Sequence, residues 1–413
     1  MSPAAIGAAR RVPRVVVRSE ERRLAPGLAA ALREYHWRRS FIRSECLLRD
    51  TDHGPKGEDP PILPDLPSAR SQVYLGGLGR GSYNHHVQIA HHKGRFYVAW
   101  SNGVRNEEDA GQRVLIADSA DARSWSPARV VLDVPAGEPY ARNCVAMRSD
   151  GERLHVAVMT EETIHDATAT GMRRIDNQTS IVEIRSSADG FGWERTFSFG
   201  NRVRWIFEAP RPTREGRLLC LCNTTREGPA ALLWPGLDLG AEPAFIPIPE
   251  PEDASFPYGE ATWYQDDEGL ITVFWRDEGA SCRMYANESR DGGRTFSVPV
   301  LTDIPDSMSR IYAGRLGDGR FYLVNNAVGT LLDRSALLLL LSRDGAVFDD
   351  AWIVNDDATA MRRKGLLKTN GLQYPCCLAH EGRLYVAYDA NKEDILCDSV
   401  AEADLVGRPA GEA

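Results

Sequence analysis

The sequence of 413 residues lacks any long hydrophobic run. Its first residues, MSPAAIGAARRVPRVVVRSEERR, contain no apolar stretch of the length that a signal peptide needs, and no later segment approaches the ~20 apolar residues of a membrane span. We therefore expect a cytoplasmic protein without membrane contact. The formal net charge of -9 also argues against a nucleic-acid partner, because affinity for a phosphate backbone comes from clustered Lys and Arg.

Motifs for cofactors and metals are missing as well. No P-loop, GxGxxG, HExxH or GxSxG pattern stands in a suitable context, so we expect no cofactor. The eight cysteines follow neither zinc-finger nor disulfide-domain spacing and should be reduced and mostly buried. Cys376, Cys377 and His380 are close in sequence, but the two cysteines should face opposite ways and no fourth ligand is evident. We predict no metal there, with a structural zinc as the minor alternative.

What the sequence does contain is one pattern repeated six times. Each copy is a short strand-like segment, a polar turn with glycine and a second strand-like segment, which is typical of a β-hairpin. The turn glycines lie 50 to 65 residues apart, as four-stranded propeller blades with variable loops require. They are Gly94, Gly151, Gly216, Gly269, Gly319 and Gly382. Helical periodicity between the strands, which an α/β fold needs, is absent. The sequence therefore predicts an all-β, six-bladed β-propeller.

A second repeat lies between the hairpins. SRDGGRTF at 289–296 is its full form, and shorter relatives occur at 119–125, 187–193 and 342–348. Its aspartates can bond the amides of their own turn, and the following aromatic residue can pack between strands. These residues are Asp121, Asp189, Asp291 and Asp344. We interpret them as folding devices, not as catalytic groups.

The chain divides into three parts. Residues 1–70 form an N-terminal arm, with a short basic helix and a proline-rich connector; residues 71–406 form the propeller, and residues 407–413 a frayed tail. We expect the arm to pack on the propeller or on a partner subunit, and the second case would make a homo-oligomer. A seventh blade built from the segment before residue 80 is the alternative to six blades. Residues 393–405 are predicted to form the outermost strand of the last blade.

The Asp-box (BNR) turns inside a propeller of this length resemble the sialidase superfamily. The resemblance covers about residues 75–400 and rests on five segments in order: SYNHHVQIAHHKGRFYVAW, YGEATWYQDDEGLITVFWRDEG, SRDGGRTF, AGRLGDGRFYLVNN and YPCCLAHEGRLYVAYDANKEDI. Together they are similar to a bacterial, sialidase-like branch that includes the rhamnosyl-glucuronate α-L-rhamnohydrolases and the propeller-type ulvan lyases. The resemblance implies a carbohydrate-active enzyme.

Polar residues stand just ahead of each hairpin. The innermost strands of all propeller blades start on the same face, so these residues should converge on one central funnel. A purely structural ring would carry small or apolar residues at most of these positions, and we therefore favour a functional pocket. The candidates are Tyr83, Asn84, His85, His86, Tyr140, Arg142, Asn143, Glu208, Glu260, Arg310, Gln373 and Tyr374.

The resemblance implies roles for four residues. Sialidases place a glutamate, an arginine one hairpin later, another arginine on the next blade and a tyrosine on the last; Glu260, Arg276, Arg310 and Tyr374 match this order. The guanidinium groups of such a set hold a sugar carboxylate. The glutamate deprotonates the tyrosine for attack on an oxocarbenium-like centre. The first-blade arginine of sialidases, within (F/Y)RIP, is replaced here by NHHV, which argues against sialic acid itself.

His85 and His86 stand at the position of that missing arginine. Successive side chains of a strand point to opposite faces, so only one imidazole should face the funnel, and we favour His86. The resemblance implies that this histidine is catalytic, because imidazole exchanges protons near neutral pH. A lyase would use His85 or His86 with Arg142 and Tyr140, but such lyases carry another histidine where this chain has GVRNEED at 103–109.

We therefore predict a glycoside hydrolase that cleaves a glycosidic bond next to an anionic, uronic-type sugar in an acidic oligosaccharide or polysaccharide. The predicted catalytic residues are His85, His86, Glu260 and Tyr374. The predicted substrate-binding residues are Tyr83, Asn84, Tyr140, Arg142, Asn143, Glu208, Arg276 and Arg310. The alternatives are a polysaccharide lyase that acts by β-elimination on a uronate, a true exo-sialidase, and a non-catalytic glycan-binding propeller.

Overall fold

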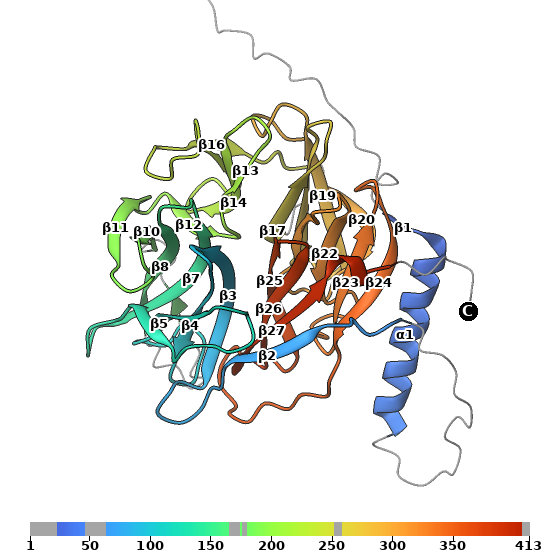
Figure 1. The fold of residues 1–413 in the computed structure, drawn as a ribbon, viewed down its shortest axis with the longest axis horizontal. Coiled ribbons are helices and arrows are strands. Elements are labelled where there is room, and N and C mark those ends of the chain that lie inside the picture. Colours follow the sequence, from blue (N-terminus) through green and yellow to red (C-terminus); the bar gives the residue numbers. More distant parts are fainter. Residues whose placement is uncertain (1–22, 46–62, 165–173, 176–179, 252–257, 407–413) are drawn as a thin grey trace, which may run out of the picture.

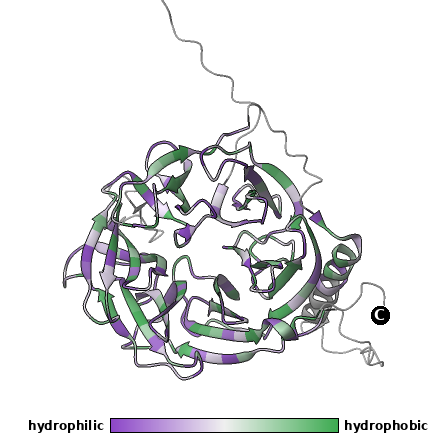
Figure 2. Cartoon of the chain, turned by 45° about the horizontal axis from the view of Figure 1, so that its top comes forward, coloured by the Kyte–Doolittle hydropathy of each residue, from purple (hydrophilic) through white to green (hydrophobic). Residues whose placement is uncertain are grey.

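The structure, a computed structural model, describes residues 23–45, 63–164, 174–175, 180–251 and 258–406. Within these ranges the chain forms six β-sheets of four or five strands. The sheets are arranged as blades in a ring, with the single long helix outside it (Figures 1 and 2). The predicted all-β, six-bladed propeller is confirmed. The predicted tail and most of the proline-rich connector lie outside the described residues.

The first three blades follow one another along the chain. Blade 1 contains β3 (Tyr83–His92), β4 (Arg95–Gly103), β5 (Arg113–Ser119) and β6 (Arg129–Leu132). Blade 2 contains β7 (Tyr140–Ser149), β8 (Leu154–Ile164), β10 (Ile181–Ser187) and β11 (Glu194–Ser198), with β9 (Arg174–Ile175) beside β8. Blade 3 contains β12 (Val203–Ile206), β14 (Leu218–Thr224), β15 (Pro229–Leu233) and β16 (Ala244–Pro247), with β13 (Arg211–Pro212) beside β14.

The last three blades complete the ring. Blade 4 contains β17 (Tyr258–Gln265), β18 (Ile271–Asp277), β19 (Arg283–Ser289) and β20 (Val300–Pro305). Blade 5 contains β21 (Tyr312–Arg315), β22 (Phe321–Asn325), β23 (Leu337–Ser342) and β24 (Val347–Asn355), to which β1 (Arg23–Leu24) adds in parallel. Blade 6 contains β25 (Leu372–His380), β26 (Arg383–Ala390), β27 (Asp394–Ala401) and β2 (Ala69–Tyr74), and a 3-10 helix (Glu402–Asp404) follows β27.

The Asp-box turns close as the sequence predicts. In each of the four, Oδ1 of the aspartate accepts hydrogen bonds from two backbone amides of its own turn. The turn at 187–193 requires glycine at position 190 both for its backbone angle and for its close contact with a neighbouring blade. Gly190 has φ of +78°, and a Cβ there would lie 2.6 Å from Cε1 of Tyr97 in the neighbouring blade. The turn therefore packs directly against the next sheet.

The hydrophobic core lies between the blades. Val98 and Trp100 of β4 share one buried cluster with Val386 and Tyr388 of β26, which joins blades 1 and 6. Each further cluster likewise combines residues of neighbouring sheets. Since both faces of the inner strands are covered, these strands read as apolar runs, and their leading ends supply the polar groups at the centre.

Ring closure departs from the sequence prediction. Residues 394–401 form β27, the third strand of blade 6, and the outermost strand is β2, which pairs antiparallel with β27. Among the described residues before position 80, β2 thus completes the sixth blade, and none of these residues forms a seventh. Asp398 on β27 accepts hydrogen bonds from Tyr388 at 2.6 Å and from Arg70 on β2 at 3.0 Å. The bond from Arg70 joins the N-terminal strand of the propeller to its C-terminal strands, and the bond from Tyr388 holds Asp398 in place.

The described part of the N-terminal arm packs on blade 5. Helix α1 (Pro26–Glu45) buries Leu28, Leu32 and Tyr35 in the same apolar cluster as Phe348 and Ile353 of β24. The arm therefore covers this blade of its own chain, and the homo-oligomer stays a prediction. No helix in the described part of the chain is both long enough and apolar enough to span a membrane.

Candidate active site

A cavity of about 400 Å³ lies at the leading ends of the inner strands. Blade 1 contributes His86 and the loop residues Glu107 and Glu108, and blade 3 contributes Arg204 and Trp205. Blades 4 and 6 supply the remaining polar walls, with Tyr258, Glu260, Arg276, Glu278 and Tyr374. The cavity thus combines carboxylates, guanidinium groups, an imidazole and aromatic rings from four blades.

Glu260, Arg276 and Tyr374 form one hydrogen-bonded cluster. The Tyr374 hydroxyl donates to Oε1 of Glu260 at 2.6 Å. Nη1 of Arg276 donates to Oε2 of Glu260 at 2.6 Å and to the Tyr374 oxygen at 2.9 Å. The three residues lie on β17 and β18 of blade 4 and on β25 of blade 6, so the cluster forms only where these two blades meet at the centre of the propeller.

The electrostatics of this cluster keep Glu260 ionised. Burial by itself would raise the pKa of Glu260, but the positive charge of Arg276 and the hydrogen bond from Tyr374 outweigh it and lower the pKa to about 2. Burial and the adjacent Glu260 charge raise the pKa of the Tyr374 hydroxyl, which is therefore protonated at neutral pH. In this pair the Glu260 carboxylate therefore accepts a hydrogen bond that the Tyr374 phenol donates.

Local irregularities of the strands aim these side chains. The register of β17 shifts between Tyr258 and Ala261, around Glu260. The register of β25 shifts between Gln373 and Cys376, and Tyr374 within this bulge has φ of +57°. A bulge re-aims the side chain that it carries, and a left-handed tyrosine is an uncommon, strained conformation. Two inner strands therefore depart from regular pairing where they meet the cavity.

The two histidines do not alternate as the sequence predicts. His86 has φ of +57°, and the register of β3 shifts between His85 and Gln88. This left-handed residue breaks the two-residue repeat, so both imidazoles lie on the same side with ring centroids 4.3 Å apart. His86 lines the cavity, whereas His85 is fully buried behind it and packs on the Tyr374 ring at 3.9 Å.

In each of the two imidazoles, Nδ1 has a polar side-chain partner that fixes the ring. Nδ1 of His85 lies 2.7 Å from Oδ2 of buried Asp389, and Nδ1 of His86 lies 3.1 Å from the Ser101 hydroxyl. Burial, and then the positive charge of Lys392, lower the pKa of both imidazoles well below the usual value. Both rings are therefore neutral at physiological pH, and Nε2 of His85 has no hydrogen-bond partner.

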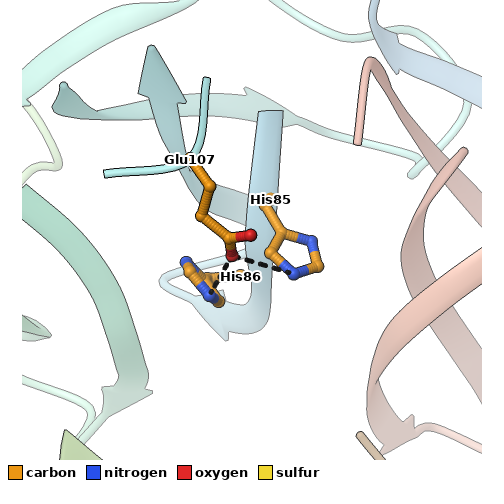
Figure 3. Close-up of side chains that lie close together, drawn as sticks. All are labelled: His85, His86 and Glu107. Carbon is orange, nitrogen blue, oxygen red and sulfur yellow. Dashed lines mark ion pairs between the residues drawn. The ribbon is translucent and has the colours of Figure 1, made fainter. Parts of the chain in front are cut away.

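Glu107 is one of the cavity residues that the sequence prediction missed. Its Oε1 accepts a hydrogen bond from Tyr83 at 3.1 Å and its Oε2 accepts one from Lys392 at 2.6 Å. Oε1 also lies 3.9 Å from Nε2 of His85 and 3.8 Å from Nε2 of His86 (Figure 3). The available signal was its place in GVRNEED, at the end of the second strand of the first hairpin, beside the start of β3.

Trp205, Tyr258, Arg204, Glu108 and Glu278 were also missed, and all five line the cavity. The Trp205 ring packs edge-on against His86 at 4.9 Å. Burial and its acidic neighbours raise the pKa of Glu108 well above the usual value. Tyr258 begins an inner strand eleven residues ahead of its turn glycine, as the candidates Tyr83 and Tyr140 do, so its position was an available signal.

Several predicted substrate-binding residues lie outside the cavity wall. Tyr140 and Arg142 do not line the cavity, and the Arg142 side chain donates to the backbone carbonyl of Asp133. Glu208 is buried in an ion pair with Arg211 at 3.0 Å. These side chains are either turned away from the cavity or already paired within the sheets, which corrects their predicted role in holding substrate.

The other misplaced candidates are structural or indirect. Asn84 is fully buried and its amide donates to the Glu393 carbonyl at 2.6 Å, so it ties β3 to blade 6. Asn143 is fully buried and accepts from Gln112 at 2.6 Å. Arg310 is almost fully buried, and its side chain donates to the backbone carbonyl of Phe207. Tyr83 reaches the site through its bond to Glu107 and through an edge-on contact with the His85 ring, with centroids 6.0 Å apart.

The predicted minor alternative of a zinc site at Cys376, Cys377 and His380 gains no support from the geometry. The Cys376 thiol lies 3.7 Å from the Gln88 side chain, and Cys377 belongs to the buried core between blades. His380 stacks on His91 with ring centroids 3.9 Å apart. Cys376 belongs to the same buried core as Cys377, and among the described residues these two thiols and His380 do not form a group of converging ligand atoms.

Comparison with known proteins finds one matching sequence family and several solved structures with a similar fold. Residues 94–386 match the family described as "BNR repeat-like domain". No curated relative matches the sequence. Among solved structures, a protein called "Sialidase" is 18% identical with a TM-score of 0.55, and the match covers 82% of this chain but only 33% of that protein.

Two further solved structures are similar. The intramolecular trans-sialidase from Ruminococcus gnavus is 12% identical with a TM-score of 0.62; the match covers 82% of this chain and 99% of that one. The Trypanosoma rangeli sialidase is 12% identical with a TM-score of 0.59; the match covers 83% and 60%. Identities this low show a shared fold.

Proposed function

The chain belongs to the BNR repeat-like family and is a β-propeller of the sialidase superfamily, and from this premise we propose that it is a glycoside hydrolase. The proposed reaction is cleavage of a glycosidic bond next to an anionic, uronic-type sugar. The observation that carries the proposal is the cluster of Tyr374, Glu260 and Arg276 on the cavity wall. Exo-sialidase action, β-elimination and binding without turnover are its competitors.

The cluster supplies Tyr374 as the nucleophile, and its hydroxyl is protonated and uncharged before the reaction. The Tyr374 oxygen attacks the anomeric carbon as the bond to the leaving oxygen breaks, and the phenolic proton passes to Glu260, 2.6 Å away. Nη1 of Arg276, 2.9 Å from the same oxygen, stabilises the negative charge that develops there. Water then attacks the anomeric carbon, the bond to the Tyr374 oxygen breaks, and Glu260 returns its proton to that oxygen. The proton of the water passes to the group that protonated the leaving oxygen, which restores the enzyme.

The leaving oxygen also has to gain a proton, and blade 1 provides the group for it. The carboxyl of Glu108, which lines the cavity and whose pKa burial and its acidic neighbours raise well above the usual value, is protonated and supplies this proton. His86 lines the same wall as a neutral imidazole, from which Nε2 can donate a hydrogen bond to the leaving oxygen. This wall comes from a different blade than Glu260 and Arg276, so a sugar ring between them meets one group on each side. Proton transfer of this kind contributes about 10²- to 10⁴-fold to a rate.

The walls of the cavity suit a carboxylated sugar. Trp205 and Tyr258 offer aromatic faces for the apolar side of a sugar ring, and Arg204 and Arg276 offer positive charge. Arg276 already serves Glu260, Tyr374 and Glu278, so Arg204 is the guanidinium we assign to the sugar carboxylate. The solved neighbours are described with oseltamivir carboxylate and with sialic acid, both of which carry a carboxylate.

The test is incubation with a panel of uronate-containing oligosaccharides and sialosides. Hydrolysis gives a saturated uronic sugar and a new reducing end, whereas β-elimination gives an unsaturated product that absorbs in the ultraviolet. We expect hydrolysis, with Tyr374→Phe, Glu260→Gln and His86→Ala each lowering kcat by at least about 100-fold. Tyr97→Phe, remote from the cavity, is the matched control and should retain the wild-type rate.

Three results would refute the proposal. Binding of an acidic glycan without any product indicates a binding module. An unsaturated product indicates a lyase, in which neutral His86 acts as the base. Release of sialic acid alone identifies an exo-sialidase.

A further inference from the structure

Three ligand-type side chains of blade 1 meet at one point. Nε2 of His85, Nε2 of His86 and a carboxylate oxygen of Glu107 lie within 4.8 Å of one another (Figure 3). Oε1 of Glu107 is 3.9 Å from the first nitrogen and 3.8 Å from the second. In the described part of the chain this is the one group of three His, Cys, Asp or Glu side chains with such convergence.

The imidazoles are oriented in the way that metal ligands usually are. A histidine that binds a metal through one nitrogen commonly has its other nitrogen bonded to a carboxylate, carbonyl or hydroxyl that fixes the ring. Here Nδ1 of His85 is held by Asp389 at 2.7 Å and Nδ1 of His86 by Ser101 at 3.1 Å. Tyr83 and Lys392 hold the carboxylate of Glu107 in turn.

A buried nitrogen without a partner is the second, independent observation. His85 is fully buried, and its Nε2 is inaccessible to solvent. This nitrogen nevertheless has no hydrogen-bond partner. A buried polar atom of this kind costs about 1 to 3 kcal/mol unless something binds it. It lies 3.9 Å from Oε1 of Glu107, which is itself 3.8 Å from Nε2 of His86, so one ion could bind all three atoms and give the buried nitrogen a partner.

From this geometry we propose that His85, His86 and Glu107 bind one divalent transition-metal ion of the zinc class. Two imidazole nitrogens and one carboxylate oxygen are a ligand set that such ions accept. Ligands about 2.1 Å from a tetrahedral ion lie about 3.4 Å apart, so the observed 3.8 and 3.9 Å need a contraction of about 0.5 Å.

The fourth coordination position would face the cavity, because His86 and Glu107 line it. Three protein ligands and one open position are characteristic of catalytic sites, in which the ion binds a water molecule or a substrate oxygen. The site uses none of the atoms of the Tyr374 cluster, although the Tyr374 ring packs on His85 at 3.9 Å. It shares His86 with the proposed hydrolysis, so a variant of Tyr374, not one of His86, separates metal binding from turnover.

Lys392 limits the affinity of this site. Its ammonium group lies 2.6 Å from Oε2 of Glu107 and repels a second cation nearby. Replacement by an uncharged side chain of similar length, Lys392→Met, should therefore tighten metal binding by at least about tenfold. If these three residues formed only a structural hydrogen-bond network, neither the wild-type protein nor the Lys392→Met variant would bind the metal ion.

The experiment is isothermal titration of the full chain, expressed without a metal-affinity tag and stripped with a chelator, with ZnCl₂ and with MnCl₂. We expect one ion per chain, with elemental analysis of the desalted complex confirming the ratio. Glu107→Gln and His86→Asn should each weaken binding at least about 100-fold, and Asp389→Asn about 10- to 100-fold. Circular dichroism shows whether each variant is folded.

Two controls make the result decisive. The double variant His91→Ala/His380→Ala removes the other stacked histidine pair and should leave the affinity unchanged. Tyr374→Phe should abolish the proposed turnover and retain the ion. The proposal is overturned if folded wild-type protein binds less than one ion per chain, or if binding survives Glu107→Gln and His86→Asn but disappears in the control double variant.

Discussion

The variant Glu260→Gln tests the electrostatics of the site through stability alone. The pKa of Glu260 is about 2 in the folded protein against 4.5 for an ordinary glutamate, because Arg276 and Tyr374 bind its ionised form. A difference of about 2.5 pKa values corresponds to about 3 kcal/mol. A lowered folded pKa means that this contribution is complete above the unfolded pKa of 4.5 and is lost as the pH falls from 4.5 toward 2.

Glutamine cannot ionise, so the variant lacks this pH-dependent contribution. We expect Glu260→Gln to be less stable than wild type by about 3 kcal/mol at pH 7 and the difference to shrink by about 1 kcal/mol by pH 3.5. Urea unfolding followed by tryptophan fluorescence at pH 7, 5 and 3.5 measures both quantities.

Glu278→Gln is the matched control, since Glu278 pairs with the same guanidinium group at 3.0 Å. Burial raises the pKa of Glu278, so its ionised form opposes folding and its replacement should show no such shrinkage toward acid pH. A stability difference for Glu260→Gln that is independent of pH would refute the reasoning, because it would mean that Arg276 does not hold Glu260 in its ionised form.

Three further outcomes follow from particular contacts. Gly371→Ala should lower the free energy of unfolding by about 3 kcal/mol, because Gly371 has φ of +118° and a Cβ would lie 2.2 Å from the Arg334 carbonyl oxygen; thermal unfolding measures the loss. Asp398→Asn should cost about 2 kcal/mol and increase proteolysis near residue 70, because Arg70 loses its charged acceptor across the ring closure. Trp205→Ala should raise KM for an active glycan about tenfold with a smaller effect on kcat, and an unchanged KM would exclude stacking on this ring.

The fold could be predicted because its signals are local. A hairpin glycine such as Gly94 and a turn aspartate such as Asp291 act within a few residues, and their repetition indicates blades wherever the chain goes next. Ring closure has no local signal. Nothing near Arg70 indicates that its strand pairs with residues 394–401, more than 300 positions later, which is why the outermost strand was placed wrongly and a seventh blade was left open.

The site was predictable only in part, for the same reason. Glu260, Arg276 and Tyr374 were named together because resemblance supplied their order along the chain, and the structure brings them within hydrogen-bond distance. Glu107 was missed because it lies in a loop, where spacing says little about direction. Arg310 was overrated, because a position ahead of a hairpin does not reveal that its side chain is buried.

The amino-acid sequence by itself determined the architecture of this protein, because strand periodicity, turn glycines and Asp-box turns act over short distances. Tertiary structure decided which side chains share the cavity. The clearest case is the histidine pair, whose side chains would point apart on a regular strand. A left-handed His86 and a bulge, held by packing between blades, turn both imidazoles toward Glu107, and only contacts among distant segments can stabilise that conformation.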